Sequence, residues 1–484
     1  MNIKVISRNV GYALLVSALF MFLSILVSVA NGNDSALAAL MISFTITFTV
    51  GVFPFIFVRK SADITLKDGY MIIALSWLLS FIFGMLPYAL WGGPFTIINA
   101  WFESVSGFTT TGSTILDNVE ALPNSLLFWR SSTHFIGGLG VVVFLLLIIP
   151  GSSQMRLRLT SLELSSLSKR EYRSGANKTV YIFTYVYFGL LLASFLMYML
   201  AGMSPFDAIN HAMSVISTGG FSTRNASIGA YDSVTIDLIT MLFMVLSSVH
   251  FGMIFVAVVT RSIKPFKNEI FKFYLSMMVV AGVIVSISIK AHGFEEAWGR
   301  AFLSGFFHVM SFASTTGFSI ADNSSWPVLS DTILVLMGVC CGMAGSTTGG
   351  IKSDRMMFLC KEVKYQLRMV LHPASVKDIR VNGRVIRQND IAPHILYIAL
   401  YGLVVIISLA ACLTLDPDNN QSFTAILSSL GNVGLSVDQL GSIYSYNGEP
   451  SSLKFIYTLD MFLGRVEIYP ILAVVMMIFS RRNK

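Results

Sequence analysis

Thr110-Thr111-Gly112 is the first of four short segments in which a hydroxyl or amide residue is followed by Thr or Val and then by Gly. The others are Ser217-Thr218-Gly219, Thr315-Thr316-Gly317 and Asn432-Val433-Gly434. They divide the chain into similar parts, and each follows a short apolar run that can form a half-helix. Four such segments in one chain can build a ring of backbone carbonyls, which is the chemistry of a cation selectivity filter.

The composition places these segments in a membrane. Hydrophobic residues make up 54% of the 484 residues and charged residues only 12%, with a mean hydropathy of +0.71. Soluble globular proteins carry about 25% charged residues. Apolar intervals that can cross a bilayer as helices occur at 9–33, 35–58, 69–102, 131–155, 179–206, 238–260, 273–289, 332–351, 391–415 and 453–480. We therefore expect an all-α polytopic membrane protein with ten spanning helices.

The first apolar interval follows Lys4 and Arg8 and so resembles a secretory signal peptide. Its uncharged run is much longer than the roughly 7–15 apolar residues of such a peptide. A second apolar interval begins after only a short turn, Asn31-Gly32-Asn33-Asp34. Residues 1–68 are therefore expected to form a transmembrane helical hairpin that is retained in the protein.

Lysine and arginine residues concentrate in alternate loops. They cluster in 1–8, 59–67, 152–178, 261–272, 352–390 and 481–484, whereas the intervening loops hold few. Because basic loops stay on the cytoplasmic side of a membrane, we expect both termini in the cytoplasm and the glycine motifs near the outer face. This topology accounts for the net charge of +7 without nucleic-acid binding. The basic segments could contact anionic lipid head groups or an acidic partner.

After the hairpin, we expect four units, each with a spanning helix, a re-entrant segment that ends in a glycine motif, and a second spanning helix. The units are 69–155, 179–262, 263–351 and 391–484, with a cytoplasmic loop at 156–178 and a basic cytoplasmic segment at 352–390. The re-entrant segments are expected at 96–109, 204–216, 296–314 and 421–431. Half-helices that enter from the outer face would direct their partly negative carbonyl ends toward a central axis, which favours a cation.

Several motifs resemble those of the Trk/Ktr/HKT superfamily of potassium transport proteins. They are SGFTTTG at 106–112, STGGFST at 217–223, STTGFS at 314–319, GSTTGGIK at 345–352 and LGRVEI at 463–468. The resemblance covers nearly the whole chain, and the N-terminal hairpin makes the chain most similar to the bacterial TrkH/TrkG branch. It implies four helix–pore-loop–helix units around one ion path, K+ as the transported ion and no organic cofactor. It further implies a location in the bacterial cytoplasmic (inner) membrane, a homodimer, and a cytosolic TrkA-type nucleotide-binding regulatory ring.

The resemblance assigns the four glycine motifs to the potassium filter. In this superfamily a serine in place of the first filter glycine goes with sodium preference, so Gly112 implies that potassium is favoured. The fourth motif, Asn432-Val433-Gly434, departs from the Ser/Thr-Thr-Gly pattern of the others.

The run Gly345-Ser346-Thr347-Thr348-Gly349-Gly350 should break its helix near the middle of the membrane. A nucleotide-binding P-loop is not indicated, because Ile351 intervenes before Lys352-Ser353 and no strand precedes the run. Two interpretations remain: a kinked helix packed closely through its glycines, or a flexible loop that lines the pore below the filter and gates it. The resemblance favours the gate.

Arg465 lies near the centre of the last apolar interval, where a charge is costly and normally faces protein or water. Asp460 and Glu467 are not at the spacing of natural partners on one helix face. Arg465 could be a cation that faces the pore and holds the gating loop, or it could form a buried ion pair with another helix. The resemblance favours the pore.

The leading hypothesis is potassium uptake through a gated, channel-like pore, and the alternative is a secondary transporter that couples potassium to sodium or protons. The spans show no clustered nucleophile, metal-ligand or acid–base set, so an enzyme is not expected. His211 and His308, in the re-entrant segments, are interpreted as hydrogen-bonded packing residues. The outer interface is expected to hold four aromatic anchors, namely Trp91, Trp101, Trp129 and Trp326.

Overall fold

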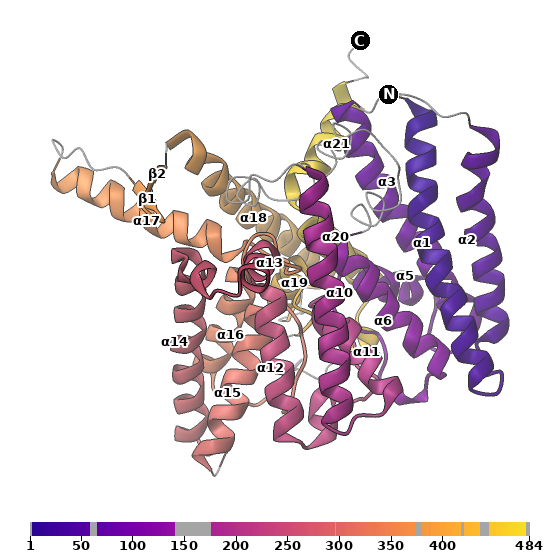
Figure 1. The fold of residues 1–484 in the computed structure, drawn as a ribbon, viewed down its shortest axis with the longest axis horizontal. Coiled ribbons are helices and arrows are strands. Elements are labelled where there is room, and N and C mark those ends of the chain that lie inside the picture. The colour runs from indigo at the N-terminus through magenta and orange to yellow at the C-terminus, as the bar shows by residue number, and fades with distance from the viewer. Residues whose placement is uncertain are drawn as a thin grey trace.

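The computed structural model describes residues 2–58, 65–140, 176–295, 297–372, 379–386, 388–417, 421–435 and 445–480, and these form a helical protein (Figure 1). Most of the predicted cytoplasmic loop 156–178 lies outside the described residues, as do the end of the predicted span 131–155 and the basic residues of 481–484.

The helices and strands follow one another in a fixed order. They are α1 (Ile3–Ala30), α2 (Leu37–Phe57), α3 (Leu66–Gly84), α4 (Leu86–Trp91), α5 (Ile97–Phe108), α6 (Asn124–Leu139), α10 (Ala176–Leu200), α11 (Pro205–Ile216), α12 (Val234–Ser248), α13 (Phe251–Thr260), α14 (Glu269–Ala291), α15 (Trp298–Ala313), α16 (Val328–Cys340), α17 (Ser353–Leu371), β1 (Ile379–Val381), β2 (Arg384–Ile386), α18 (Gln388–Leu415), α19 (Ser422–Gly431), α20 (Ser451–Val466) and α21 (Ile468–Ser480). The two strands pair in an antiparallel hairpin.

Helices α1 and α2 form the predicted N-terminal hairpin at one edge of the molecule (Figure 1). They pack closely, since a Cβ atom added to Gly11 would lie only 2.8 Å from the carbonyl oxygen of Gly51. The turn between them is tied to α6, because Asp34 accepts hydrogen bonds from the Ser125 N–H (3.1 Å) and the Ser125 hydroxyl (2.8 Å). The hairpin is thus part of the folded body.

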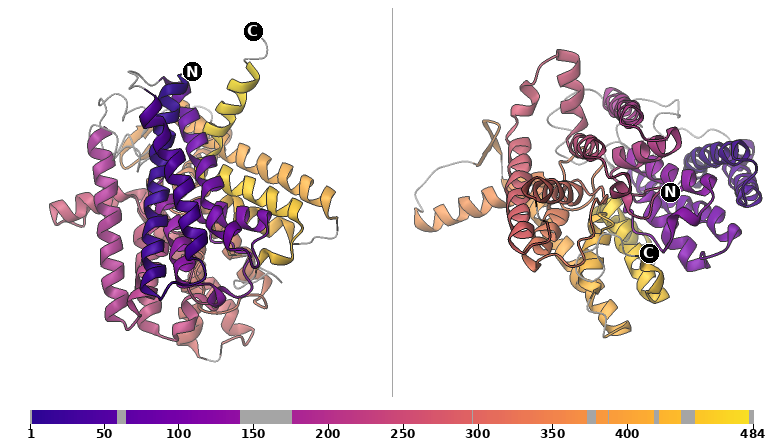
Figure 2. Two further views of the ribbon diagram at one scale, coloured as in Figure 1. Left: turned by 90° about the vertical axis from the view of Figure 1, so that its right-hand side faces the viewer. Right: turned by 90° about the horizontal axis from the view of Figure 1, so that it is seen from below.

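The remaining described helices repeat one pattern. A long helix, a short helix and a second membrane helix follow each other as α3–α5–α6, α10–α11–α12, α14–α15–α16 and α18–α19–α20. Seen from below, the successive parts of the chain surround a common centre, from purple through magenta and orange to yellow (Figure 2, right). The short helices α5, α11, α15 and α19 match the predicted re-entrant segments to within about two residues.

The spans differ from expectation in the second helix of each unit. Within the described residues, six helices are long and apolar enough to cross a membrane: α1, α2, α3 with α4, α10, α14 and α18. The predicted continuous span 238–260 is instead bent by 103° between α12 and α13. Helix α16 ends at Cys340, where the glycine-rich run was expected to break it, and α20 and α21 are separated at Glu467.

The bend between α12 and α13 is possible because its freed backbone groups find partners. The Phe251 N–H donates to the Gly345 carbonyl (3.0 Å), and the Ser248 carbonyl accepts from the Met343 N–H (2.9 Å). Non-helical backbone is tolerated at membrane depth only when it is satisfied in this way. Its partners lie in another unit of the chain, so an uncharged interval alone could not reveal the bend.

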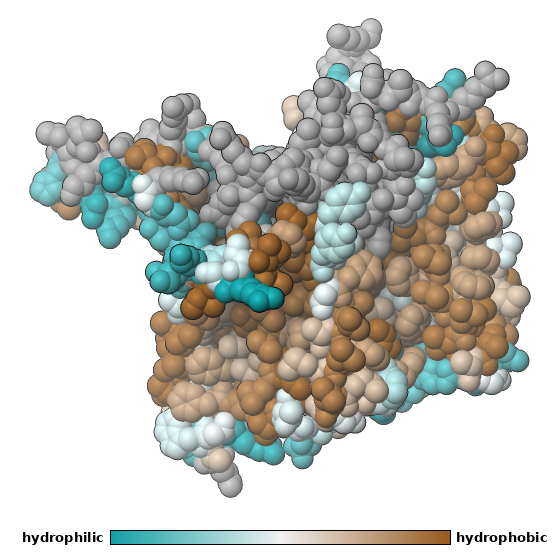
Figure 3. Space-filling view, viewed as in Figure 1, coloured by the Kyte–Doolittle hydropathy of each residue, from teal (hydrophilic) through white to brown (hydrophobic). Residues whose placement is uncertain are grey.

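The outer surface suits a membrane protein. Hydrophobic side chains cover most of the middle of the face shown in Figure 3, whereas hydrophilic ones lie along the lower edge and on α17. Exposed apolar side chains of this kind include Phe48 and Phe53 on α2, and Val279 and Val280 on α14. The start of α1 and the end of α21 lie at the same end of the molecule, at the top of Figure 1.

Candidate ion-conduction site

Each short helix ends in a loop with the same backbone conformation. The first residue of each loop adopts a left-handed conformation, with φ of 53° at Thr110, 55° at Thr218, 52° at Thr315 and 54° at Asn432. L-residues other than Asn and Asp rarely adopt this conformation. It is held here by the next residue, whose N–H donates a 2.9 Å hydrogen bond back to a serine carbonyl of the short helix. These pairs are Thr111–Ser106, Gly219–Ser214, Thr316–Ser311 and Val433–Ser428.

This common geometry gives the register of the loops. The third residue of each loop is a glycine with positive φ: Gly112 (86°), Gly220 (84°), Gly317 (73°) and Gly434 (81°). In the second loop the geometry therefore places Thr218-Gly219-Gly220 opposite Thr110-Thr111-Gly112, one residue later than the predicted Ser217-Thr218-Gly219. Ser217 lies instead in the last turn of the short helix, where its hydroxyl donates to the Met213 carbonyl (2.7 Å).

The four loops contact one another in a closed cycle. A Cβ atom added to Gly112 would overlap the carbonyl oxygen of Gly219. The same relationship holds for three further pairs in sequence order: Gly220 with the Thr316 oxygen, Gly317 with the Val433 oxygen, and Gly434 with the Thr111 oxygen. Only glycine allows neighbouring strands to approach so closely at positive φ. The cycle brings four carbonyl oxygens together, and a ring of carbonyl dipoles can replace the hydration shell of an alkali cation.

Asn432 explains the departure of the fourth motif from the Thr-Thr-Gly pattern. Asparagine adopts left-handed backbone more readily than most residues. Its side-chain Nδ2 donates to the Thr111 hydroxyl (3.0 Å) and to the Met461 carbonyl (2.9 Å). The fourth loop is thus joined to the first loop and to α20 by one buried amide.

The glycine-rich segment 345–350 lies directly under these loops. The Gly349 N–H donates to the Thr315 hydroxyl (3.2 Å), and a Cβ atom on Gly349 would lie 2.5 Å from the Gly431 carbonyl oxygen. The Thr347 hydroxyl donates to the Ile216 carbonyl (3.1 Å) at the end of α11. The segment therefore contacts the second, third and fourth loop regions at once.

Arg465 holds this segment from the opposite side. Its guanidinium donates to the Thr347 carbonyl, and also to the carbonyls of Gly137 (2.6 Å) and Gly138 (3.1 Å) at the end of α6. Glu467, two residues away, pairs with Arg355 on α17 (2.8 Å). The geometry thus gives Arg465 backbone carbonyl partners on the glycine-rich segment and on α6.

A cavity opens beside Arg465 under the loops. Its lining includes Ser346, Thr347 and Thr348 of the glycine-rich segment, Gly138 at the end of α6, and Arg465 itself. The positive charge therefore faces a polar space below the carbonyl ring. An arginine in such a place raises the energy of a cation next to it.

A family model supports this geometry. The model of the TrkH family, described as a cation transport protein, matches residues 36–279 and 294–482. The chain belongs to the TrkH family. The resemblance seen in its motifs is thereby confirmed, and the chain is a transport protein rather than an enzyme.

Individual TrkH-family proteins match over almost their whole length. The Trk system potassium uptake protein TrkH of Halomonas elongata is 31% identical and covers 100% of both chains. TrkG of Escherichia coli is 29% identical over 97% of each chain. The crystal structure of the potassium transporter TrkH from Vibrio parahaemolyticus has a TM-score of 0.88 and 27% identity over 98% of each chain, which confirms the all-α polytopic fold.

Behind the first two loops of this TrkH-family chain lies a buried ion pair that the motifs did not indicate. Arg130 Nε lies 2.7 Å from Glu103 Oε1, and both side chains are almost fully buried. Glu103 also accepts from the Ile115 N–H (3.1 Å), while Arg130 donates to the Ser222 carbonyl (3.3 Å). Arg130 thus acts within the fold, whereas its position before an apolar interval suggested an outer loop.

The lone histidines and the tryptophans complete the comparison with expectation. His211 Nδ1 bonds to the Asp207 carbonyl and His308 Nδ1 to the Ser304 carbonyl, so both are hydrogen-bonded within their own short helices. Trp129 was expected at the interface but is fully buried, with Nε1 donating to the Gly84 carbonyl (3.2 Å). That expectation was wrong because the outer end of α6 is covered by the first loop region.

Proposed function

We propose that this TrkH-family chain carries potassium across the bacterial cytoplasmic membrane through the carbonyl ring, as a gated, channel-like pore. The observation that carries the proposal is the closed cycle of glycine–carbonyl contacts that begins with Gly112 and Gly219. The names of the relatives support potassium as the ion, since TrkH and TrkG are potassium uptake proteins. Gly112 in the first loop agrees with a preference for potassium over sodium.

The gate in this proposal is segment 345–350 together with Arg465. Three features support it: the segment contacts the loops from below, its backbone is non-helical, and a guanidinium fixes its Thr347 carbonyl. Conduction would require the segment to leave this position. Because Arg465 joins the segment to α6, a movement of α20 would change both the barrier and the charge beside it.

We further propose regulation by a cytosolic nucleotide-binding subunit of the TrkA type and assembly as a homodimer. Support comes from α17, a helix with four basic residues (Arg355, Lys361, Lys364 and Arg368) that projects away from the body in Figure 1. Helix α17 follows the proposed gate directly, so a partner bound there could move it. Both termini would lie in the cytoplasm with α17.

A coupled transporter is the second candidate, because α20 carries a buried carboxyl group. Asp460 is 1% exposed, and its Oδ1 accepts a hydrogen bond from the Ser408 hydroxyl (2.7 Å). Its Oδ2 has no hydrogen-bond partner among the described residues. Ionisable groups inside a membrane often mark ion or proton paths.

Flux reversal distinguishes the two candidates. Purified protein in liposomes would be placed under a fixed potassium gradient, with and without an added proton or sodium gradient, and the voltage of zero net flux measured. A pore gives the potassium equilibrium voltage in every case. A shift of that voltage with the proton gradient, abolished by Asp460→Asn, would support coupling and contradict the pore.

A further inference from the structure

The four filter loops are braced in two different ways. In the first loop the Thr109 and Thr111 hydroxyls are 2.8 Å apart, and in the third loop the Ser314 and Thr316 hydroxyls are 2.7 Å apart. In the same two loops the helix serine donates to the carbonyl that follows the ring glycine, from Ser106 to Ser113 and from Ser311 to Phe318, both at 2.6 Å. Loops one and three are therefore held by their own hydroxyl groups.

The second loop lacks both of these braces. Gly219, at the position of Thr111 and Thr316, has no side chain, and the Ser214 hydroxyl has no hydrogen-bond partner among the described residues. The fourth loop also lacks hydroxyls at these positions, but the Asn432 amide joins it to Thr111 and Met461. The second loop needs another support.

His134 on α6 occupies the space that a side chain at position 219 would fill. A Cβ atom added to Gly219 would overlap the imidazole ring of His134. The ring is fully buried and stacks on Phe221, with centroids 4.0 Å apart and planes 17° apart. Nδ1 lies 2.8 Å from the Gly107 carbonyl oxygen, and Nε2 lies 3.2 Å from the Phe221 nitrogen.

These partners assign the tautomer of the imidazole. A carbonyl can only accept, so Nδ1 carries the hydrogen, and a backbone N–H can only donate, so Nε2 accepts. One neutral ring thus connects the first short helix to the second filter loop. It bonds on either side of the Gly219–Gly220 pair, through Gly107 and Phe221.

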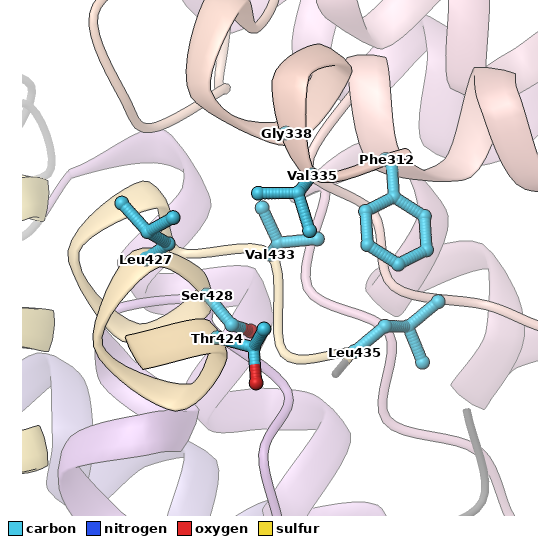
Figure 4. A pocket seen from close by; sticks show the side chains of 8 residues that line it. All are labelled: Phe312, Val335, Gly338, Thr424, Leu427, Ser428, Val433 and Leu435. Carbon is cyan, nitrogen blue, oxygen red and sulfur yellow. The ribbon is translucent and has the colours of Figure 1, made fainter. Parts of the chain in front are cut away.

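The corresponding place between the third and fourth units has no such ring. Val335 is five residues before the end of α16, as His134 is five before the end of α6, and Val433 and Leu435 correspond to Gly219 and Phe221. There Val335 lines an apolar pocket with Phe312, Val433 and Leu435 (Figure 4). The imidazole is therefore a feature of the first two units, and it is matched to the glycine at position 219.

We propose that His134 is the positioning residue of the second filter loop and sets the place of the Gly219 carbonyl oxygen in the ring. The inference rests on the proposed potassium pore and adds a determinant of its ion selectivity. A displaced carbonyl at one corner changes the cavity and the field that the ion meets. His134 acts through Gly219 and Phe221 and does not itself contact the ion.

The test separates the hydrogen bonds of His134 from its volume. His134→Gln keeps a donor and an acceptor, whereas His134→Phe keeps a ring and loses both. The ratio of K+ to Na+ flux would be measured in liposomes, with thermal unfolding recorded for each variant. We expect the Phe variant to lose roughly tenfold in this ratio, because a buried N–H and a buried carbonyl lose their partner, and the Gln variant to stay near wild type. Met461→Leu, at the corresponding place on α20, is the control and should leave the ratio unchanged.

The outcomes distinguish this inference from the proposed function. A wild-type protein without potassium preference would refute the potassium filter itself. A selective wild type, with a folded His134→Phe variant of equal selectivity, would overturn only the role of His134, as would a Gln variant as impaired as Phe. If the Phe variant does not fold, Gly219→Ala decides: it should conduct poorly alone and better when combined with His134→Ala, and no improvement would overturn the proposal.

Discussion

Gly112 lies against the carbonyl oxygen of Gly219, so closely that no Cβ atom fits between the two loops. Three further glycines have the same relationship with the next loop, and Gly434 closes the cycle on Thr111. Close packing of backbone against backbone leaves the ring little freedom to adapt to an added side chain. The selectivity of the proposed pore therefore depends on residues that have no side chain at all.

Gly112→Ser should lower the preference for potassium over sodium by about tenfold or more, because the new side chain displaces the Gly219 carbonyl; a tenfold change corresponds to about 1.4 kcal/mol. The measurement is the ratio of K+ to Na+ flux in liposomes. Gly92→Ser is a matched control, since Gly92 has a similar φ of 82° but no atom near its added Cβ. Equal loss in both variants would attribute the effect to backbone strain rather than to the ring.

Arg465→Gln should raise potassium flux through folded protein by roughly tenfold, since removing about 1.4 kcal/mol from a barrier has this effect. The charge beside the cavity and the hydrogen bonds to Thr347 and Gly137 would be weakened together. Single-channel or liposome flux per molecule is the measurement. Arg300→Gln, whose side chain is 70% exposed, serves as the control. An effect limited to expression level would indicate a structural role for Arg465.

Deletion of Gly345–Gly349 should increase potassium flux if this segment is the barrier. Thr347→Val is a milder test, because it removes only the hydroxyl bonds to the Ile216 and Ser247 carbonyls. Thr414→Val on the exposed side of α18 is its control. Flux no higher than wild type, in a deletion variant that folds, would contradict a gating role.

Asn432→Ala should both destabilise the protein and reduce selectivity. Alanine is strained at a φ of 54°, and the bonds to Thr111 and Met461 are lost. Asn432→Gly relieves the strain but still loses the bonds, so it should recover stability without recovering selectivity. We expect a difference in unfolding free energy between the two variants of about 1 kcal/mol, the cost of left-handed backbone for a non-glycine residue. Identical selectivity in wild type and Asn432→Gly would show that the amide does not brace the ring.

Glu103→Gln should lower the unfolding free energy by about 3–5 kcal/mol, because Arg130 would become an uncompensated buried charge. The thermal unfolding midpoint in detergent is the measurement. The exposed pair Asp232–Arg300, at 3.4 Å, provides the comparison, and Asp232→Asn should change little. A small effect at Glu103 would mean that water reaches this pair.

Much of the architecture could be predicted from local sequence. Apolar runs that end in Thr-Thr-Gly or Asn-Val-Gly predicted the short helices α5, α15 and α19, because a half-helix and its glycine turn are adjacent in the chain. The break after Cys340 was also predictable, since glycines occupy the positions that follow it. Features set by distant contacts were not predictable in this way.

The second loop shows this limit. Ser217-Thr218-Gly219-Gly220 contains two glycines, so its register could be settled only by the Gly219 hydrogen bond and by the contact of Gly220 with Thr316. The bend at Ser248 depends likewise on partners at Met343 and Gly345. His134 gave no signal, because its role arises from the absence of a side chain at position 219.

The central claim is a potassium-selective carbonyl ring, and a comparison of alkali-ion fluxes tests it most directly. Purified protein in liposomes would be assayed with K+, Rb+, Na+ and Li+ in turn, with Gly112→Ser alongside. We predict high flux of K+ and Rb+, low flux of Na+ and Li+, and a loss of this contrast in Gly112→Ser. Equal flux of all four ions through the wild-type protein, or unchanged contrast in the variant, would contradict the account.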